Sequence, residues 1–377
     1  MTEAEDCYAN TQSNREFPLP KALARRYRTA ALAAVTALAA SAACAQAPTT
    51  LGLTTLTATA DTPEITLWYP ASAAESEIRR GVFVYRAALE APYAAATGGD
   101  KLPLVVISHG SGGSAIPHHE TARALVAAGF IVAATLHAGD NFRDATKAGP
   151  ESWRSRPVEV SKTIDALASS GIWKSRADTQ KVGVYGMSAG GLTALSLGGA
   201  TWSLYALAQH CATHFDADVG FCGRRGTDKT PPNQATLQQR KEQYPQWLKL
   251  GSPDKTAQVH RDPRIAAVIA AVPIAAVVNS ASVAASGVPI GLISASEDTV
   301  LLTKLHSTAL AAACGRCTTL AALNPGGHFS VLAPWPAEMQ QQEGGIALDP
   351  PGFDRGQVAA AYRASAAFFK QHLVPAK

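Results

Sequence analysis

The sequence predicts an α/β fold, in which a mostly parallel central sheet carries helices on both faces. Along most of the chain, short apolar stretches rich in β-branched residues alternate with stretches of helical periodicity. Some of the predicted strands, of which Leu102–Ser108 is the clearest, are apolar throughout, as strands covered on both faces are. A helix between successive strands allows them to pair in parallel. The 377 residues, 47% hydrophobic and 16% charged, have the composition of a globular protein.

In the first part of the chain, the alternation of β-branched and polar residues and the position of glycine and proline set the expected elements. We expect strands over residues 51–59, 64–69, 81–86, 102–108, 130–136 and 181–185. Helices are expected over residues 120–128, 156–169 and 192–198. Gly129 ends the first of these helices, and Val158, Ile164 and Leu167 are predicted to face inward from the second.

The alternation pauses over residues 201–263, which are more polar than the rest of the chain. We predict that this segment, with a helix over residues 234–250, is a lid-like insertion over the C-terminal edge of the sheet. The pattern then resumes with strands over residues 265–272, 288–294 and 318–323, and helices over 300–313 and 354–372. No internal repeat interrupts it. Residues 46–377 are therefore expected to form one domain.

The N-terminal segment has the layout of a secretory signal. Basic residues from Lys21 to Arg28 precede an alanine-rich run over residues 29–43, and Ala43-Cys44-Ala45 forms a small-x-small cleavage pattern. We therefore expect residues 1–45 to be a signal peptide with an N-terminal extension, and the mature protein to be periplasmic or secreted without a membrane span. The alternatives are a membrane anchor, a twin-arginine signal and a lipid attached to Cys44.

Four cysteines remain after this cleavage, and an even number in an exported chain predicts disulfides. Their spacing favours the local pairs Cys211–Cys222 and Cys314–Cys317. A redox motif at Cys314-Gly-Arg-Cys317 is the alternative, but no helix opens there after a strand, as a thioredoxin-like motif requires.

A Gly-x-Ser-x-Gly motif at Gly186, Ser188 and Gly190 lies between a predicted strand and a predicted helix. A serine at such a turn is strained and exposed, with the first amides of the helix beside it. The motif alone is common, but this context makes Ser188 the candidate nucleophile.

A serine needs a histidine base and a group that orients the histidine. Asp298 and His328 each follow a predicted strand, and in parallel sheets sites lie at the C-terminal ends of strands. The chain order Ser188, Asp298, His328 is typical of serine hydrolases built on such a sheet. Glu297 is the alternative acid.

The predicted reaction also needs amides that bind an oxyanion. The amide of Ala189, next to the nucleophile, is one candidate. The glycine-rich loop from His109 to Gly113 is expected to supply the second, from Ser111 or, failing that, Gly112. His109 is expected to brace this loop.

Other chemistries find weaker support. Gly110-x-Gly112-x-x-Ala115 with Asp140 imitates a dinucleotide fingerprint, but that interpretation leaves Ser188, Asp298 and His328 unexplained. His210 and His214 with Asp216 and Asp218 have the spacing of metal ligands, although solvated polar residues are the simpler interpretation. A net charge of +4 without basic, aromatic-interleaved runs gives no case for nucleic acid. We expect neither cofactor nor metal.

The chain resembles α/β-hydrolases, and among them the bacterial predicted dienelactone hydrolases and the platelet-activating-factor acetylhydrolase-like family. The matching pieces are Leu67-Trp68-Tyr69-Pro70, Ser108-His109-Gly110-x-Gly112-Gly113, Arg156-Pro157-Val158, Gly186-x-Ser188-x-Gly190-Gly191 and Gly326-Gly327-His328-Phe329. The resemblance implies an α/β-hydrolase fold, with Ser188 as nucleophile, His328 as base and a carboxylate at a strand end.

Two departures bear on what the resemblance implies. In the animal acetylhydrolases the acid follows the strand after the serine helix, where this chain has Val272-Pro273-Ile274; the acid must then come from the next strand, which favours Asp298. Dienelactone hydrolases proper use a cysteine nucleophile, which weakens the transfer of dienelactone as substrate.

We therefore expect an exported serine hydrolase that cleaves small carboxylic esters. Candidates for an apolar acyl or alcohol pocket are Met187, Ile116, Val300, Phe329 and Trp335, and residues 201–263 are expected to determine its size. An acyltransferase using the same three residues and a non-catalytic binding protein of the same fold are the alternatives. The sequence gives no indication of the oligomeric state.

Overall fold

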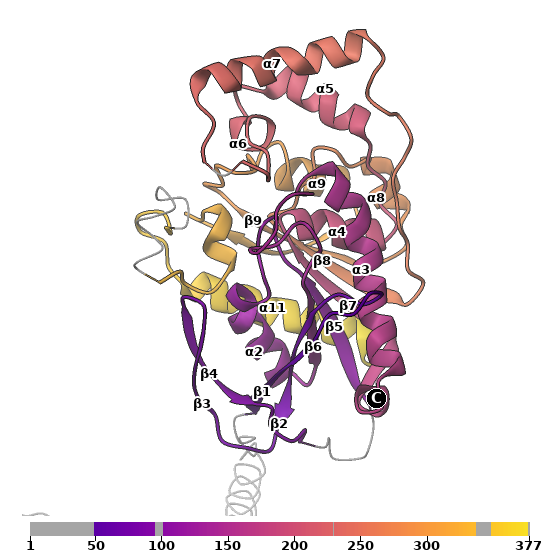
Figure 1. The fold of residues 1–377 in the computed structure, drawn as a ribbon, viewed down its shortest axis with the longest axis vertical. Helices are drawn as coiled ribbons and strands as arrows, with labels where there is room; N and C mark the ends of the chain where they lie inside the picture. Colours follow the sequence, from indigo (N-terminus) through magenta and orange to yellow (C-terminus); the bar gives the residue numbers. More distant parts are fainter. Residues whose placement is uncertain (1–48, 95–100, 229, 337–347, 376–377) are drawn as a thin grey trace, which may run out of the picture. The chain divides into compact units, whose positions relative to one another are not determined.

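The computed structural model describes residues 49–94, 101–228, 230–336 and 348–375, and its central element is a ten-stranded sheet (Figure 1). The strands lie in the order β10-β9-β8-β7-β5-β6-β2-β1-β4-β3. Their bounds are β1 Thr50–Leu56, β2 Ile65–Ala71, β3 Ser76–Arg80, β4 Phe83–Leu89, β5 Leu102–Ser108, β6 Ile131–Thr135, β7 Ala177–Met187, β8 Ile265–Ala271, β9 Ile290–Ala295 and β10 Thr318–Leu323.

The sheet is mostly parallel, which confirms the predicted fold class. From β6 through β5, β7, β8 and β9 to β10, each strand pairs in parallel with the next. Antiparallel pairing is confined to the other end of the sheet, where β2 joins β6 to β1 and β3 joins β4. The carboxyl ends of the parallel strands therefore meet at one edge, where the candidate residues are expected.

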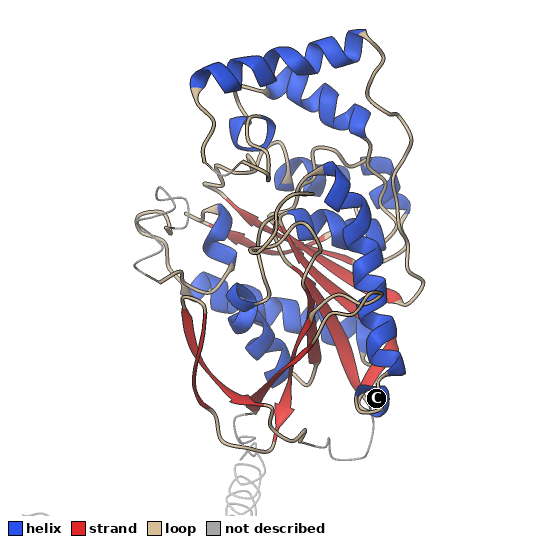
Figure 2. Ribbon diagram, viewed as in Figure 1, coloured by secondary structure: helices blue, strands red, loops and turns tan. Residues whose placement is uncertain are grey.

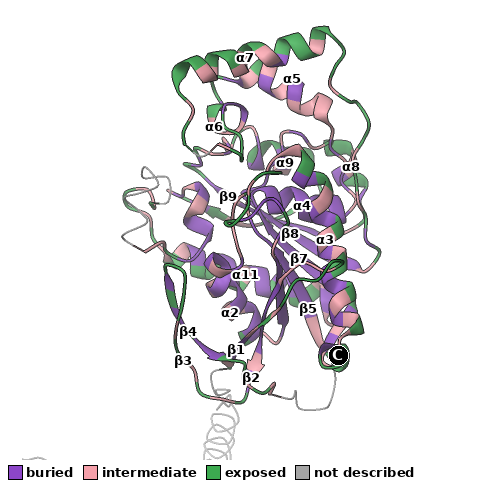
Figure 3. Cartoon of the chain, in the orientation of Figure 1, coloured by how far each residue is buried: buried purple, intermediate pink, exposed green. Residues whose placement is uncertain are grey.

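Helices cover both faces of the sheet (Figure 2). One face carries α2 (His119–Ala127) and α11 (Gly356–Leu373), and the other carries α3 (Pro150–Ser169), α4 (Ala189–Leu197), α8 (Ser280–Ala285) and α9 (Ser307–Ala313). The described residues also form three 3₁₀ turns, η1 (Ile116–His118), η2 (Trp173–Ser175) and η3 (His328–Val331). Figure 3 shows that burial is concentrated in the strands and in the faces of the helices that cover them.

The insertion contains more helix than the sequence predicts. It comprises α5 (Leu204–His214), α6 (Val219–Cys222) and α7 (Gln234–Lys249), with α5 packed against α7. The disulfide Cys211–Cys222 joins α5 to α6, and Cys314–Cys317 joins the end of α9 to β10. Both predicted pairings are thus present. Because α6 has only four residues, it lacks the periodicity that would reveal it in the sequence.

The structure also corrects predictions about individual elements. Val158 is 39% exposed, because the inward stripe of α3 contains Trp153, Arg156, Val160, Ile164 and Leu167 instead. The predicted helix over residues 300–313 begins only at Ser307, since residues 299–306 form turns.

Among the described residues, no helix is long and apolar enough to cross a membrane. The predicted signal peptide lies outside the described residues.

Candidate active site

Ser188 occupies a strained turn between β7 and α4. Its φ of 57° lies in the left-handed region, which a residue with a side chain seldom adopts. The flanking glycines make the turn possible. A Cβ on Gly186 would lie 1.9 Å from the Gly190 carbonyl oxygen, and one on Gly190 would lie 1.9 Å from that of Ser108. The motif is therefore required by close packing of the chain around Ser188.

His328 and Asp298 come together at the same edge of the sheet. His328 Nδ1 is 2.7 Å from Asp298 Oδ2, and both residues are buried. Asp298 Oδ1 accepts hydrogen bonds from the amides of Val300 and Leu301, at 2.9 and 2.8 Å. Glu297, the alternative acid, is exposed. The carboxylate is thus held in place, and it fixes the orientation of the imidazole ring.

No hydrogen bond joins Ser188 Oγ to His328 within the part of the chain that the structure describes. In enzymes without substrate, such contacts are often long or poorly aligned and tighten only in the complex.

The glycine-rich loop after β5 lies against Ser188. A Cβ on Gly110 would be 3.4 Å from the Cβ of Ser188. The Gly112 amide donates to Asp140 Oδ1 at 2.8 Å, so the alternative donor Gly112 is already engaged. Within the described residues, the amides of Ser111 and Ala189 donate to no protein acceptor. These two remain available to a ligand.

A buried ion pair braces this loop. Arg156, on α3, donates to Asp140 at 3.0 and 2.8 Å and to the carbonyl oxygens of His109 and Gly110 at 2.6 and 3.2 Å. Asp140 in turn accepts from the hydroxyls of Ser111 and Ser152, at 2.7 and 2.6 Å. A shift of the loop away from Arg156 and Asp140 would break charge-assisted hydrogen bonds.

The electrostatics of this pair favour its charged form. Burial alone raises the pKa of Asp140, but the Arg156 charge and hydrogen bonds from Ser152, Ser111 and Gly112 outweigh it and lower the pKa to about 2. Burial lowers the pKa of Arg156, and Asp140 opposes that effect. In the dinucleotide-binding alternative, Asp140 would bind a ribose hydroxyl of the ligand. Its ion pair with the buried Arg156 does not fit that role.

A cavity of about 920 Å³ adjoins the loop. Four of the predicted pocket residues line it, namely Met187, Ile116, Phe329 and Trp335. Val300 packs elsewhere, in an apolar cluster with Trp153, Leu301 and Phe221. None of the described residues of the 201–263 insertion lines the cavity, so the expectation that the insertion determines its size is wrong. The hairpin of β3 and β4, which pairs with β1, lines the cavity with its tip, residues 80–83.

The insertion instead contacts two loops that carry candidate site residues. A Cβ on Gly220 would lie 2.3 Å from the Thr299 carbonyl oxygen, next to Asp298, and one on Gly226 would lie 2.9 Å from Ser111 Oγ. The insertion thus lies next to the loops that carry Asp298 and Ser111.

Asp218 links the insertion to the loop after Asp298. Its Oδ2 atom lies 2.8 Å from the Nε2 atoms of both His210 and His306, and its Oδ1 atom accepts from the Leu302 amide. His306 Nδ1 accepts from the Ala275 amide, so Nε2 must carry the proton donated to Asp218. Burial raises the pKa of Asp218, but the hydrogen bonds from the two histidines outweigh it and hold the pKa well below its usual range.

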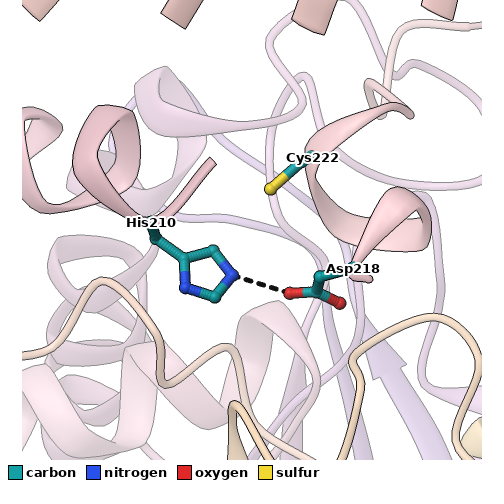
Figure 4. A group of neighbouring side chains, drawn as sticks. All are labelled: His210, Asp218 and Cys222. Carbon is teal, nitrogen blue, oxygen red and sulfur yellow. Dashed lines mark hydrogen bonds and ion pairs between the residues drawn. The ribbon is translucent and has the colours of Figure 1, made fainter. Parts of the chain in front are cut away.

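Figure 4 shows His210, Asp218 and Cys222 side by side, two of which belong to the metal-ligand alternative that the sequence analysis considered. The Cys222 sulfur belongs to a disulfide, and the Asp218 carboxylate is hydrogen-bonded to both His210 and His306. Asp216, another residue of that alternative, is exposed and pairs with Lys241.

A second serine–histidine–carboxylate chain lies behind the loop. His137 bonds through Nε2 to Ser108 Oγ at 2.8 Å and through Nδ1 to Glu159 Oε2 at 2.6 Å. Ser108 and His137 are fully buried, so this chain has a packing role beneath the site. The His137 amide also bonds to His109 Nε2, and His109 Nδ1 bonds to the Gly110 carbonyl, which agrees with the predicted bracing role of His109.

Comparison with models of protein families shows to which family the chain belongs. The model of the dienelactone hydrolase family matches residues 89–285, from β4 to α8, a segment that includes the glycine-rich loop and the Ser188 turn. The chain belongs to the dienelactone hydrolase family. Its fold is therefore that of the α/β-hydrolases, as the resemblance implied. No curated protein matches the sequence.

Sequence reasoning missed the structural roles of Asp140 and Arg156 in this member of the dienelactone hydrolase family. One signal was present: Arg156 stands in the apolar stripe of α3, three residues after Trp153 and four before Val160. An arginine at an inward position requires a buried anion. The partner could not be read from the sequence, because Asp140 lies in the loop after another strand.

Proposed function

We propose that this dienelactone hydrolase family member is an exported serine hydrolase that cleaves carboxylic esters. Family membership supports a hydrolase of the α/β-hydrolase type. The bond between His328 and Asp298 at the edge that presents Ser188 carries the proposal furthest, because a binding protein has no need of it.

In the proposed reaction, Ser188 Oγ attacks the ester carbonyl and His328 Nε2 takes its proton. Asp298 holds the Nδ1 proton, so that Nε2 is free to accept, and stabilises the imidazolium that forms. His328 then protonates the leaving alcohol, and water, activated by the same histidine, releases the acid from the acyl-enzyme.

The negative charge that develops on the carbonyl oxygen needs donors. We assign this role to the amides of Ser111 and Ala189. Their lack of protein acceptors supports the assignment, and so does the brace that holds the loop of Ser111.

Replacement of Ser188 by Ala tests the proposal. The variant should lose hydrolysis of p-nitrophenyl butyrate by a factor of about 10⁴ or more, while its circular dichroism stays unchanged. Turnover equal to that of the wild type would exclude Ser188 as nucleophile. Product analysis with an added alcohol would reveal an acyltransferase by formation of a new ester.

Export is the second part of the proposal. Two disulfides are compatible with an oxidising compartment outside the cytoplasm. We expect the mature protein, expressed in a bacterium with its full leader, to begin at Gln46 in the mass spectrum of the periplasmic fraction. An intact N-terminus in the cytoplasmic fraction would contradict export.

A further inference from the structure

The cavity beside the glycine-rich loop adjoins the proposed reaction centre. Gly110 and Met187 contribute to its wall, and Gly110 packs against Ser188. Phe329, the residue that follows His328, forms another part of the wall. A group bound in the cavity would therefore extend from an ester held at Ser188.

Aromatic rings extend from His328 toward the β3–β4 hairpin. The centroids of His328 and Phe329 are 5.1 Å apart, those of Phe329 and Trp335 5.9 Å, and those of Trp335 and Phe83 5.5 Å. Phe83 and its neighbour Val82 are at the hairpin tip and line the cavity. Rings arranged edge to face present large apolar surfaces, which favour an apolar ligand.

The charges in the wall balance one another. Arg143 and Glu64 form a two-pronged ion pair, with both distances 3.0 Å. Among the residues of the wall that the structure describes, the other ionised ones are Arg80 and Glu90, one of each sign. The described part of the wall therefore has no excess charge with which to select an anion or a cation.

Two histidines, His109 and His118, also line the wall, and burial favours the neutral form of both. Burial lowers the pKa of His118 to about 3. It also lowers that of His109 well below its usual range, with further contributions from the charges of His137 and Arg156.

We propose that this cavity binds a long or bulky uncharged apolar group of the ester substrate, and that the tip of the β3–β4 hairpin determines which groups fit. The proposal rests on the proposed function of Ser188. At about 920 Å³ the cavity is near the upper end of the usual range for small-molecule sites, about 300–1,000 Å³, so an acetyl group would leave most of it empty.

Two ester series test the proposal, p-nitrophenyl acyl esters from acetate to octanoate and alkyl acetates from ethyl to octyl. In one of the two series kcat/KM should rise with chain length, by up to about fourfold for each methylene buried. The series that rises identifies the group, acyl or alcohol, that enters the cavity. A flat or falling dependence in both would overturn the proposal.

Two hairpin variants provide a matched pair. Val82 and Val84 are 37% and 42% exposed, but only Val82 lines the cavity. Val82→Asp should lower kcat/KM for the octyl or octanoyl ester at least fivefold more than for the shortest ester. Val84→Asp should leave both within twofold. Equal effects of the two variants would contradict the role of the hairpin tip.

Failure of the proposed function remains distinguishable. If no ester turns over and a fluorophosphonate does not label Ser188, the binding of p-nitrophenyl octyl ether, followed by tryptophan fluorescence, still tests the cavity. Saturable binding that Val82→Asp weakens and Val84→Asp does not would support the cavity. Absence of binding would overturn it.

Discussion

At the scale of single residues, Asp140 and Arg156 connect the stability of the molecule to its proposed chemistry. Both are fully buried, and together they hold the carbonyl oxygens and the Ser111 hydroxyl of the loop beside Ser188. Removal of one partner of a buried pair leaves the other charge uncompensated, which typically costs about 3–5 kcal/mol.

Asp140→Asn should therefore reduce the free energy of unfolding by about 3 kcal/mol. Because the loop then loses its fixed position, we expect kcat to fall about 10- to 100-fold with little change in KM. Glu75→Gln, which disrupts the pair with the partly exposed Arg123, is the control and should change stability by about 1 kcal/mol or less. Urea unfolding and steady-state kinetics measure both; a wild-type kcat in a destabilised Asp140→Asn would confine the pair to a structural role.

Gly190 tests the packing around the serine turn. A Cβ at this position would meet the Ser108 and His109 carbonyl oxygens at 1.9 and 2.9 Å. We expect Gly190→Ala to lower the free energy of unfolding by about 3 kcal/mol or more, or to prevent folding. Gly171→Ala, where an added Cβ meets nothing within 4 Å, should be tolerated. Similar unfolding midpoints for the two variants would contradict the packing argument.

At the scale of elements, the insertion stabilises the loop that carries Asp298. Asp218 on the insertion accepts from His306 and from the Leu302 amide, both on the segment that follows Asp298. All of its partners donate hydrogen bonds to Asp218. The NH₂ group of an asparagine at position 218 would therefore face at least one other donor, and that hydrogen bond would be lost.

Asp218→Asn should therefore make the insertion more sensitive to limited proteolysis and lower kcat about tenfold, since the orientation of Asp298 becomes less fixed. Asp216→Asn is the matched control, because Asp216 is exposed and pairs only with Lys241 at the surface. Equal proteolysis rates for the two variants would show that Asp218 does not anchor the insertion.

The elements that the sequence predicted best are the ones whose packing is uniform along their length. β5 and β8 are buried on both faces, so their apolar runs identify them. β3 was missed because its residues Ser76–Arg80 are almost all exposed and charged or polar at the edge of the sheet. The beginning of α3 was missed because its first turns carry few apolar residues, and the burial of Arg156 depends on a partner distant in sequence.

At the scale of the whole molecule, the order of residues along the chain predicted the candidate site better than it predicted the cavity. Each of the three candidate residues, Ser188, Asp298 and His328, follows the end of a strand. Parallel pairing brings these strand ends to one edge of the sheet, independently of the conformation of the loops. The cavity depends on how the β3–β4 hairpin folds against β1, and on the loops from β5 and β10. Such contacts between distant segments leave no periodic pattern in the sequence.

Glu159 predicts how the stability of the molecule depends on pH. Burial raises its pKa from 4.5 to about 7, despite the charge of Arg156. The folded state then holds a proton that the unfolded state releases above pH 4.5, so this contribution to stability is complete at low pH and is lost as the pH rises through about 7. The shift corresponds to at most about 3 kcal/mol.

Glu159→Gln should remove this part of the pH dependence. The free energy of unfolding of the variant, measured relative to that of the wild type, should therefore be higher at pH 8 than at pH 5. Urea unfolding at both values measures it, with the exposed Glu151→Gln as control. If the difference in free energy of unfolding between variant and wild type does not change with pH, Glu159 is ionised in both the folded and the unfolded state.

The central claim is that Ser188 is an activated nucleophile, and reaction with a fluorophosphonate followed by peptide mass spectrometry tests it most directly. A serine reacts with this reagent only when a base accepts its proton and the oxyanion site is formed. We predict one label per chain, on Ser188, with labelling at least 100-fold slower in His328→Ala. Labelling of another residue, or equal rates in the wild type and His328→Ala, would contradict the account.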